Sequence, residues 1–213
     1  MVSNEVRFGG FAGSRGWVFE LSGGRLCLDF VNTVDQRPSP EPKELLPAYE
    51  DLLSWARQTG ILTAREARDL RALARRRPKE ARRALDRAHG LREALYRIFS
   101  TRSPGRAHLK ELQSFVPLAF GSPEVRPGAE YPLVFRNDLS RLDGPLSPVV
   151  RSAVELLAGD QLSRVRQCAA DECAWLFLDQ SKNRSRQWCD MTVCGNRAKA
   201  RRFYARKRRT KHR

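Results

Sequence analysis

Four of the five cysteines lie between Cys168 and Cys194, in two pairs of identical spacing. Four residues separate Cys168 from Cys173, fifteen residues follow, and four residues again separate Cys189 from Cys194. Two closely spaced thiol pairs with a longer connecting segment are typical of structural zinc sites, in which four thiolates fill the coordination sphere. The pattern therefore predicts one structural Zn²⁺ with Cys168, Cys173, Cys189 and Cys194 as its ligands.

Other uses of cysteine fit the sequence less well. A disulfide framework needs an oxidising compartment, and residues 1–17 lack the charged and apolar segments of a signal peptide. No apolar run is long enough to cross a bilayer, so we expect a cytoplasmic protein. A redox dithiol usually has two residues between its cysteines, and only one pair. Unrelated buried cysteines are the remaining alternative, which we accept for Cys27.

The charge of the chain is large and uneven. The net charge is +16, and residues 161–213 contain 15 Lys and Arg against 4 Asp and Glu. A block of one sign at one end is typical of proteins that bind a polyanion, whereas mixed charge serves solubility better. The basic segment lacks the broad apolar face of a membrane-surface helix. We therefore expect a nucleic acid, and no membrane, as the partner.

The spacing around the cysteines predicts a small module with a hairpin and a helix. We expect Trp175–Leu178 to be one strand, Ser181–Asn183 a turn, and Trp188 part of a returning strand. A helix of about fourteen residues, roughly 20 Å long, should follow Cys194, with Asn196 as its cap. Its apolar stripe, expected to pack on the module, is Ala200, Phe203 and Tyr204. This layout is treble-clef-like, and a zinc ribbon is the alternative.

The candidate nucleic-acid contacts are basic side chains and one amide of this module. They are Arg184, Arg186, Asn196, Arg197, Lys199, Arg201, Arg202, Arg206, Lys207, Arg208 and Arg209. A helix of this length fits the major groove of DNA, and arginine contacts phosphate more often than bases. We predict binding to double-stranded DNA with modest sequence preference. RNA, which the same charges would attract, and a protein partner remain alternatives, and some cations could instead offset the negative zinc–thiolate cluster.

The first 160 residues predict an α+β fold, a mixed helical domain with a small sheet. A hairpin is expected from Trp17–Leu21 and Arg25–Val31, joined by Ser22–Gly24. We place the boundary with the zinc module near residue 162. Apolar spacing predicts helices at about 46–59, 63–77, 79–102, 107–118 and 147–159, and a strand at 131–135.

Two polar residues in this domain raise the question of a ligand. Asp29 and Asn32 interrupt an apolar run and are candidates for a small-molecule pocket, whereas the simpler interpretation is a turn cap at a strand end. They are too few for a catalytic site, and the chain has no phosphate loop or nucleophile elbow. A four-cysteine zinc site also leaves no open coordination position. We expect no enzyme, and a first domain that binds an effector or mediates homodimerisation.

Two stretches resemble known families. The sequence WCDMTVCGNRAKARRFYARKR, Trp188–Arg208, resembles the CGNR zinc-finger proteins, which are named after the residues at Cys194–Arg197. The sequence GGRLCLDFVNTVDQR, Gly23–Arg37, resembles the opening of the ABATE domain that usually precedes this finger. The resemblance covers nearly the whole chain. It implies a bacterial protein of mixed α/β fold with a C-terminal zinc module, from a family described as transcription regulators and sometimes as RNA-binding.

Overall fold

The structure is a computed structural model, and it describes residues 9–13, 16–101, 104–121, 123–126 and 133–211. The α-helices are α1 Leu26–Val31, α2 Tyr49–Gln58, α3 Ala64–Arg76, α4 Pro78–Ser100, α5 Arg106–Phe120, α6 Ser147–Ala158 and α7 Asn196–Lys211. Short 3-10 turns, η1 Gly144–Leu146 and η2 Leu162–Arg164, precede α6 and the last hairpin, and η3 Met191–Gly195 is a π-helical turn. The strands are β1 Gly10–Gly13, β2 Gly16–Phe19, β3 Val34–Asp35, β4 Lys43–Glu44, β5 Pro123–Val125, β6 Leu133–Phe135, β7 Val165–Gln167 and β8 Leu176–Leu178.

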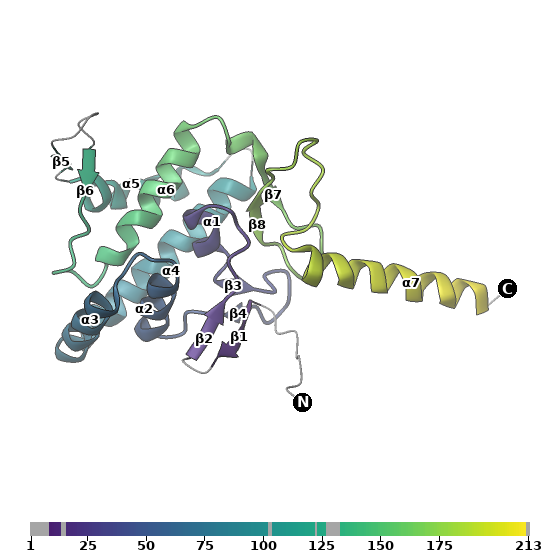
Figure 1. Ribbon diagram of the computed structural model, residues 1–213, viewed down its shortest axis with the longest axis horizontal. Coiled ribbons are helices and arrows are strands. Elements are labelled where there is room, and N and C mark those ends of the chain that lie inside the picture. The colour runs from purple at the N-terminus through teal and green to yellow at the C-terminus, as the bar shows by residue number, and fades with distance from the viewer. Residues whose placement is uncertain (1–8, 14–15, 102–103, 122, 127–132, 212–213) are drawn as a thin grey trace.

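Helices α1 to α6 form one body, and α7 projects from the side of this body where β7 and β8 lie (Figure 1). The long helix α4 contacts α1, α2, α3 and α5. Its apolar residues at three- and four-residue spacing are buried, namely Ala84, Ala88, Leu91, Leu95 and Ile98. The expected start of α3 is confirmed, since Thr63 and Glu66 form a reciprocal capping box. The strands form four separate antiparallel pairs, β1–β2, β3–β4, β5–β6 and β7–β8.

The predicted hairpin of Trp17–Leu21 with Arg25–Val31 is wrong. Leu26–Val31 is the short helix α1, and β2 pairs instead with β1, with Phe11 opposite Val18. Cys27, Leu28, Phe30 and Val31 are all buried, because α1 lies between α4, α6 and β8. A short apolar run that is buried on every side has no periodicity that distinguishes a helix from a strand.

The predicted partner of the strand near Trp175 is also wrong. β8 pairs with β7, which precedes the cysteines, in the register Val165–Leu178 and Gln167–Leu176. The segment after the expected turn returns without forming a strand. For the strand predicted at 131–135, the described part is β6, which pairs with β5, and residues 131 and 132 lie outside the described residues.

The two predicted parts of the chain share one continuous hydrophobic core. The same cluster contains Phe30, Trp55 and Leu95 of the helical part and Leu176 and Phe177 of β8. The region predicted as the boundary, near residue 162, runs through η2 directly into β7. The cysteine module therefore packs directly against the helices and is not a separate domain joined by a flexible linker. Among the described residues, no helix combines the length and apolar character needed to span a membrane.

Candidate zinc centre and nucleic-acid interface

The first cysteine pair lies in the turn between β7 and β8. The backbone N–H of Cys168 donates to the carbonyl of Trp175 at 2.8 Å, and that of Cys173 donates to Ala170 at 3.0 Å. Ala174 follows with a φ of +58°, a left-handed conformation that is uncommon for a residue with a side chain. The tight turn brings both thiols to the same side of the hairpin, as a zinc knuckle requires.

The second pair is positioned by the start of the last helix. The carboxylate of Asp190 accepts hydrogen bonds from the backbone N–H groups of Thr192, at 2.6 Å, and Val193, at 2.9 Å. Asp190 is therefore the cap, and the helical turns begin at Met191, one turn earlier than predicted. Asn196 is not the cap, since its amide donates to the carbonyl of Thr192 at 2.9 Å. Cys194 consequently lies within the first helical turn.

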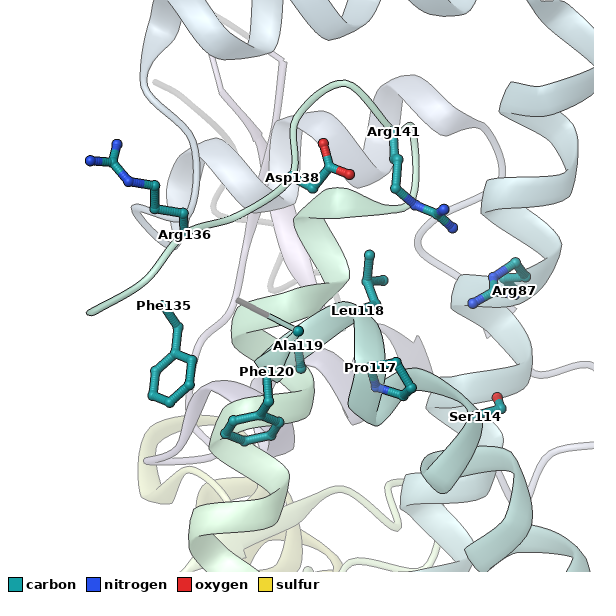
Figure 2. Close-up of a pocket in the computed structure, with 11 residues that line it drawn as sticks. Arg87, Ser114, Pro117, Leu118, Ala119, Phe120, Phe135, Arg136, Asp138 and Arg141 are labelled. Carbon is teal, nitrogen blue, oxygen red and sulfur yellow. The ribbon is translucent and has the colours of Figure 1, made fainter. Parts of the chain in front are cut away.

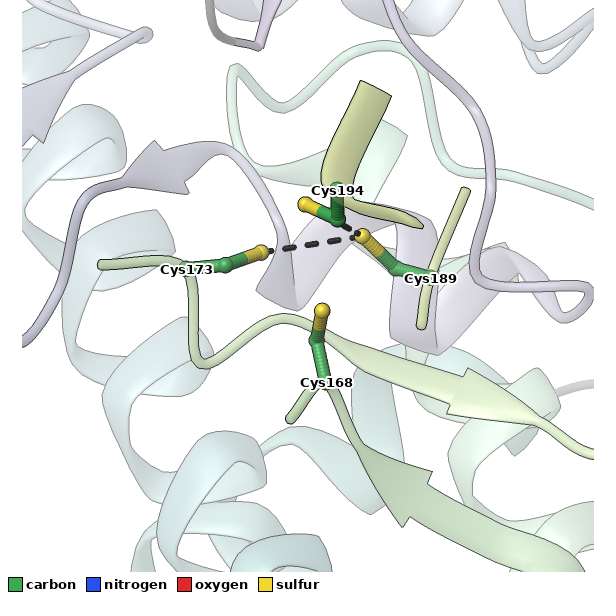
Figure 3. A group of neighbouring side chains, drawn as sticks. All are labelled: Cys168, Cys173, Cys189 and Cys194. Atoms are coloured by element: carbon green, nitrogen blue, oxygen red, sulfur yellow. Dashed lines mark hydrogen bonds between the residues drawn. The ribbon is translucent and has the colours of Figure 1, made fainter. Parts of the chain in front are cut away.

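The four thiols meet in a buried cluster (Figure 3). Their sulfur atoms all lie within 4.8 Å of one another, and Cys189 is 3.6 Å from both Cys173 and Cys194. A tetrahedral Zn²⁺ with Zn–S bonds of about 2.3 Å has sulfur–sulfur edges of about 3.8 Å. The cluster fits a zinc ion, and the chain binds one structural zinc through Cys168, Cys173, Cys189 and Cys194. The hairpin knuckle and the helical ligand together confirm the treble-clef-like arrangement.

The protonation of these thiols depends on their mutual contacts. Hydrogen bonds from Cys173 and its neighbours lower the pKa of Cys168, whereas the hydrogen bond with Cys168 raises the pKa of both Cys173 and Cys189. One thiolate therefore opposes the formation of the next. A divalent cation removes this opposition, so the group as a whole favours a bound metal over four ionised thiols.

Cations of the same module lie beside the cluster. Arg186 donates from Nε to the carbonyl of Trp188 at 2.9 Å, and from Nη2 to that of Cys189. Its guanidinium also stacks 4.5 Å from the ring centre of Phe177. Arg186 is therefore one of the cations that can offset the charge of the cluster, and its side chain is engaged within the module. Lys199, two residues after Arg197, is exposed.

Arg197 faces the helical part of the chain. It lines a small space of about 10 Å³ next to Cys173 and Cys194, together with Glu20 and Asp35. Burial raises the pKa of Glu20 to about 7, and the charge of Arg197 partly opposes this rise. Arg197 thus lies between two acidic side chains and the cysteine cluster. Glu20 and Asp35 were not among the predicted site residues, because nothing in their local sequence places them near residues 150 positions away.

Hydrogen bonds from the segment around α1 hold the outer edge of β8. The amide of Asn32 donates to the carbonyl of Leu176 at 2.8 Å and accepts from its N–H at 2.9 Å. The N–H of Leu178 donates to the carbonyl of Gly23 at 2.8 Å, and the indole of Trp175 donates to Val34 at 2.9 Å. A side chain on Gly23 would lie 2.8 Å from the backbone nitrogen of Asp29, so only glycine allows this approach.

The predicted pocket residues have structural partners here. Both ends of the Asn32 amide are occupied by Leu176, and the side chain is buried. The carboxylate of Asp29 accepts from the N–H of Gly23 at 2.8 Å. Asn32 therefore acts like an additional strand residue beside β8, and Asp29 fixes the turn before α1. The two cavities described below are lined by other residues.

Asp29 predicts a pH dependence of stability. Burial raises the pKa of its carboxyl from 3.8 to about 6, so the folded state holds a proton that the unfolded state has released between these values. The free energy of unfolding therefore falls as the pH rises through this window. We expect Asp29→Asn to remove this loss and to be more stable than wild type by on the order of 2 kcal/mol at pH 7.

Denaturant unfolding at several pH values from 4.5 to 8 measures this difference. The gain should grow up to about pH 6 and then stay level. Asp160→Asn, at an exposed position, is the control and should show no such trend. A constant difference between Asp29→Asn and wild type at all pH values would contradict the assignment.

The predicted packing of the last helix is wrong. Phe203 and Tyr204 are each 63% exposed, and they contact each other edge to face with ring centres 5.6 Å apart. Helix α7 contacts the module through η3 at its beginning and extends away from the body (Figure 1). It comprises sixteen residues, slightly more than predicted. No broad apolar face was available in its sequence to fold it back.

The predicted nucleic-acid residues differ in how far they are engaged within the protein. Arg186 lies against the module, and Arg197 lies beside Glu20, Asp35 and the cysteine cluster. Arg201 is 3.2 Å from the carboxylate of Asp171, and Arg202 stacks 5.9 Å from the ring centre of Trp188. The remaining exposed members of the set are Arg184, Asn196, Lys199 and Lys207. The side chains of Arg206, Arg208 and Arg209 lie outside the described part of the chain.

The loop before Cys189 is organised by a buried carboxylate that the sequence did not single out. Asp179 is fully buried and accepts from the N–H of Ser181 at 2.9 Å and from that of Arg186 at 3.1 Å. The turn predicted at Ser181–Asn183 is confirmed. Asp179 thereby presents Arg184 and neighbouring residues on an exposed loop beside α7.

A buried four-cysteine centre that joins a hairpin turn to a basic helix, packed on a helical domain, defines a zinc-finger protein with an N-terminal helical domain. Residues 24–160 match the ABATE family model, described as "Putative stress-induced transcription regulator", and residues 164–207 match the CGNR zinc finger. The chain therefore belongs to the ABATE family and carries a CGNR zinc finger, as the resemblance implied. A search of the curated proteins finds no match.

Proposed function

We propose that the protein regulates transcription by binding double-stranded DNA through α7 and the exposed cations beside it. The observation that carries the proposal is the geometry of α7. A helix of sixteen residues, about 24 Å long, leaves the body with exposed Lys199, Arg201, Arg202 and Lys207. A helix without a broad apolar face gains little from the protein core, whereas the major groove of DNA, about 12 Å wide, accommodates it.

The zinc centre contributes by orienting this helix. Cys194 lies in the turn that leads directly into α7, so coordination by the other three cysteines fixes where the helix begins and in which direction it leaves. Structural zinc supplies folding energy that so small a module lacks. In this proposal the metal touches no DNA. Contacts come mainly from cations to phosphates, with modest sequence preference.

Single-stranded RNA is the second candidate, favoured by one observation. Phe203 and Tyr204 are exposed next to basic side chains, and exposed aromatics near cations are the usual platform for unstacked bases. Duplex binding needs only the charges, whereas binding to single strands should also use these rings. Phe203→Ala combined with Tyr204→Ala therefore separates the two candidates, and both positions are exposed enough for the folded state to tolerate the change.

Removal of two charges tests the surface itself. Lys199 and Arg202 are exposed and lie three residues apart on one face of α7. We expect Lys199→Gln combined with Arg202→Gln to lower duplex affinity about tenfold or more, because two phosphate contacts are lost. Each lost contact should also reduce the steepness of the dependence of affinity on salt concentration by about 0.9. Fluorescence anisotropy with matched duplex DNA, duplex RNA and single-stranded RNA, at several salt concentrations, measures both quantities.

The control has the same net charge. Arg68→Gln combined with Arg76→Gln changes two exposed arginines of α3 and should leave affinity and salt slope unchanged. Equal losses in both double variants would mean that net charge alone attracts DNA. A preference of the wild type for single-stranded RNA, lost with the aromatic double variant, would replace the proposal by the second candidate. Weak binding to all three probes would point to a protein partner.

A further inference from the structure

A cavity of about 600 Å³ lies where the helical domain meets the zinc module. Pockets for small molecules usually have volumes of about 300–1,000 Å³. Its walls come from the loop between β3 and β4, from α4 and from the first cysteine knuckle. Gln167, directly before Cys168, and Ala174, directly after Cys173, are the knuckle residues. An occupant would therefore contact both parts of the protein, one residue away from two zinc ligands.

Two buried arginines form a rigid polar wall in this cavity. The side chain of Arg92 is 4% exposed and donates to both carboxylate oxygens of Glu44, at 2.7 and 2.5 Å. The side chain of Arg37 is 10% exposed, donates to Glu93 at 2.8 Å and stacks 4.1 Å from the ring centre of Tyr96. Neither side chain can move without breaking these contacts, so the wall is formed before any ligand arrives.

The lining also contains one arginine whose charge is not used within the part of the protein that the structure describes. Arg97, also in the lining, is exposed, and no ion pair is found for it in the described part of the chain. Glu44 and Glu93 neutralise Arg92 and Arg37, so the charge of Arg97 remains uncompensated.

Most of the remaining lining is apolar. Val34, Pro38, Pro42, Ala174 and the ring of Tyr96 contribute to the walls, and Gln167 adds one polar side chain. One uncompensated positive charge beside such surfaces suits a molecule with one negative charge and a flat apolar body. Guanidinium groups bind carboxylates through paired hydrogen bonds. The lining thus favours an aromatic carboxylate over a sugar, which would need more polar partners, and over a highly charged phosphate, which would need more cations.

A second cavity, beside α5, offers neither an uncompensated cation nor contact with the zinc module. It measures about 470 Å³ and is lined by residues of α4, of α5 and of the segment between β6 and η1 (Figure 2). Its arginines Arg87 and Arg141 are both paired with Asp143, and Arg136 is paired with Glu124. Among the residues that the structure describes, none of the zinc module lines it. A ligand there would find its cations already used and would have no direct contact with the finger.

We propose that the cavity between α4 and the zinc knuckle binds a small aromatic carboxylate, and that this ligand changes the affinity of α7 for DNA. The effect on DNA affinity rests on the proposed function. Ala174 in the cavity wall holds a left-handed conformation between Cys173 and Trp175. A ligand that binds one arrangement of the knuckle better than another shifts their populations by that difference in affinity, and α7 begins at the same zinc ion.

Binding is tested on the full-length, zinc-loaded protein, without DNA. Benzoate is the probe, benzamide its uncharged counterpart, and inorganic phosphate the anion without an apolar body. We expect saturable shifts of backbone NMR signals near Arg37, Arg97 and Ala174 with benzoate, and at least tenfold weaker binding of the other two. Arg97→Gln should weaken benzoate binding at least fivefold. Arg83→Gln, at an exposed position of the same helix, is the matched control and should bind like wild type.

Three results would overturn the site. They are equal binding of benzamide and benzoate, an unchanged affinity in Arg97→Gln, and shifts confined to residues away from the cavity. Regulation of DNA binding by the ligand is tested separately, by measuring the duplex DNA affinity with and without saturating benzoate. No change there would overturn regulation and leave the site standing. If benzoate binds but the protein binds no nucleic acid, the proposed function fails and the carboxylate site does not.

Discussion

Replacing Cys194 by serine is expected to release the zinc and to destabilise the helical domain as well as the finger. The cysteines are buried in the same cluster as Phe30, Trp55 and Leu95, so loss of the metal loosens residues that the helices need for their core. Serine is a poor zinc ligand, and a structural zinc site is worth about 10 kcal/mol or more in small modules. A loss of this order approaches the whole stability of an ordinary domain, about 5–15 kcal/mol.

Zinc content and thermal unfolding measure the two parts of this prediction. Zinc released by a thiol reagent should fall from one ion per chain to nearly none, and the midpoint of the helical circular-dichroism signal should fall by more than about 10 °C. Treatment of the wild type with a chelator should reproduce both effects. Cys27→Ala is the matched control, because Cys27 is buried in the same core but lies outside the zinc cluster.

The control should keep its zinc while losing some packing. Retention of one zinc ion by Cys194→Ser would contradict the ligand assignment. Loss of zinc with an unchanged unfolding midpoint would instead show that the helical domain is stable alone, and that the shared core contributes little. The two failures are distinct, since one concerns the metal and the other the contact between the two parts.

Replacing Asn32 by alanine should have the next largest effect. The change leaves the N–H and the carbonyl of Leu176 buried without their partners. Each such loss costs about 1–3 kcal/mol, so we expect the free energy of unfolding to fall by about 2–5 kcal/mol. Asn32→Asp should not rescue it, because a carboxylate would face the Leu176 carbonyl and has no N–H to donate.

Denaturant unfolding gives the change in free energy for Asn32→Ala. Asn183→Ala, at an exposed loop position, is the control and should change stability by less than about 0.5 kcal/mol. A loss below about 1 kcal/mol for Asn32→Ala would mean that water takes over both partners of Leu176. In that case the hydrogen bonds of Asn32 would not be what holds the α1 segment to β8.

Local patterns in the sequence predicted the elements whose cause is local. The capping box of α3 needs only Thr63 and Glu66, which lie in one turn, and it starts the helix next to the predicted residue 63. The buried stripe of α4 follows from its 3.6-residue period. The four zinc ligands follow from their spacing, since only four residues separate the two cysteines of each pair and a structural zinc needs four ligands. The same reasoning failed for Leu26–Val31, whose helix is decided by what surrounds it.

By itself, then, the sequence determined the zinc ligands, the main helices, the basic last helix and the family. Only the tertiary structure decided how these parts meet. The contact of Asn32 with Leu176 joins residues 144 positions apart, and no local pattern encodes it. The exposure of Phe203 and Tyr204 and the cavity beside Arg97 depend equally on where α7 and α4 lie. Spacing controls metal binding because the ligands are close in the chain, whereas burial and cavities arise from distant segments packing together.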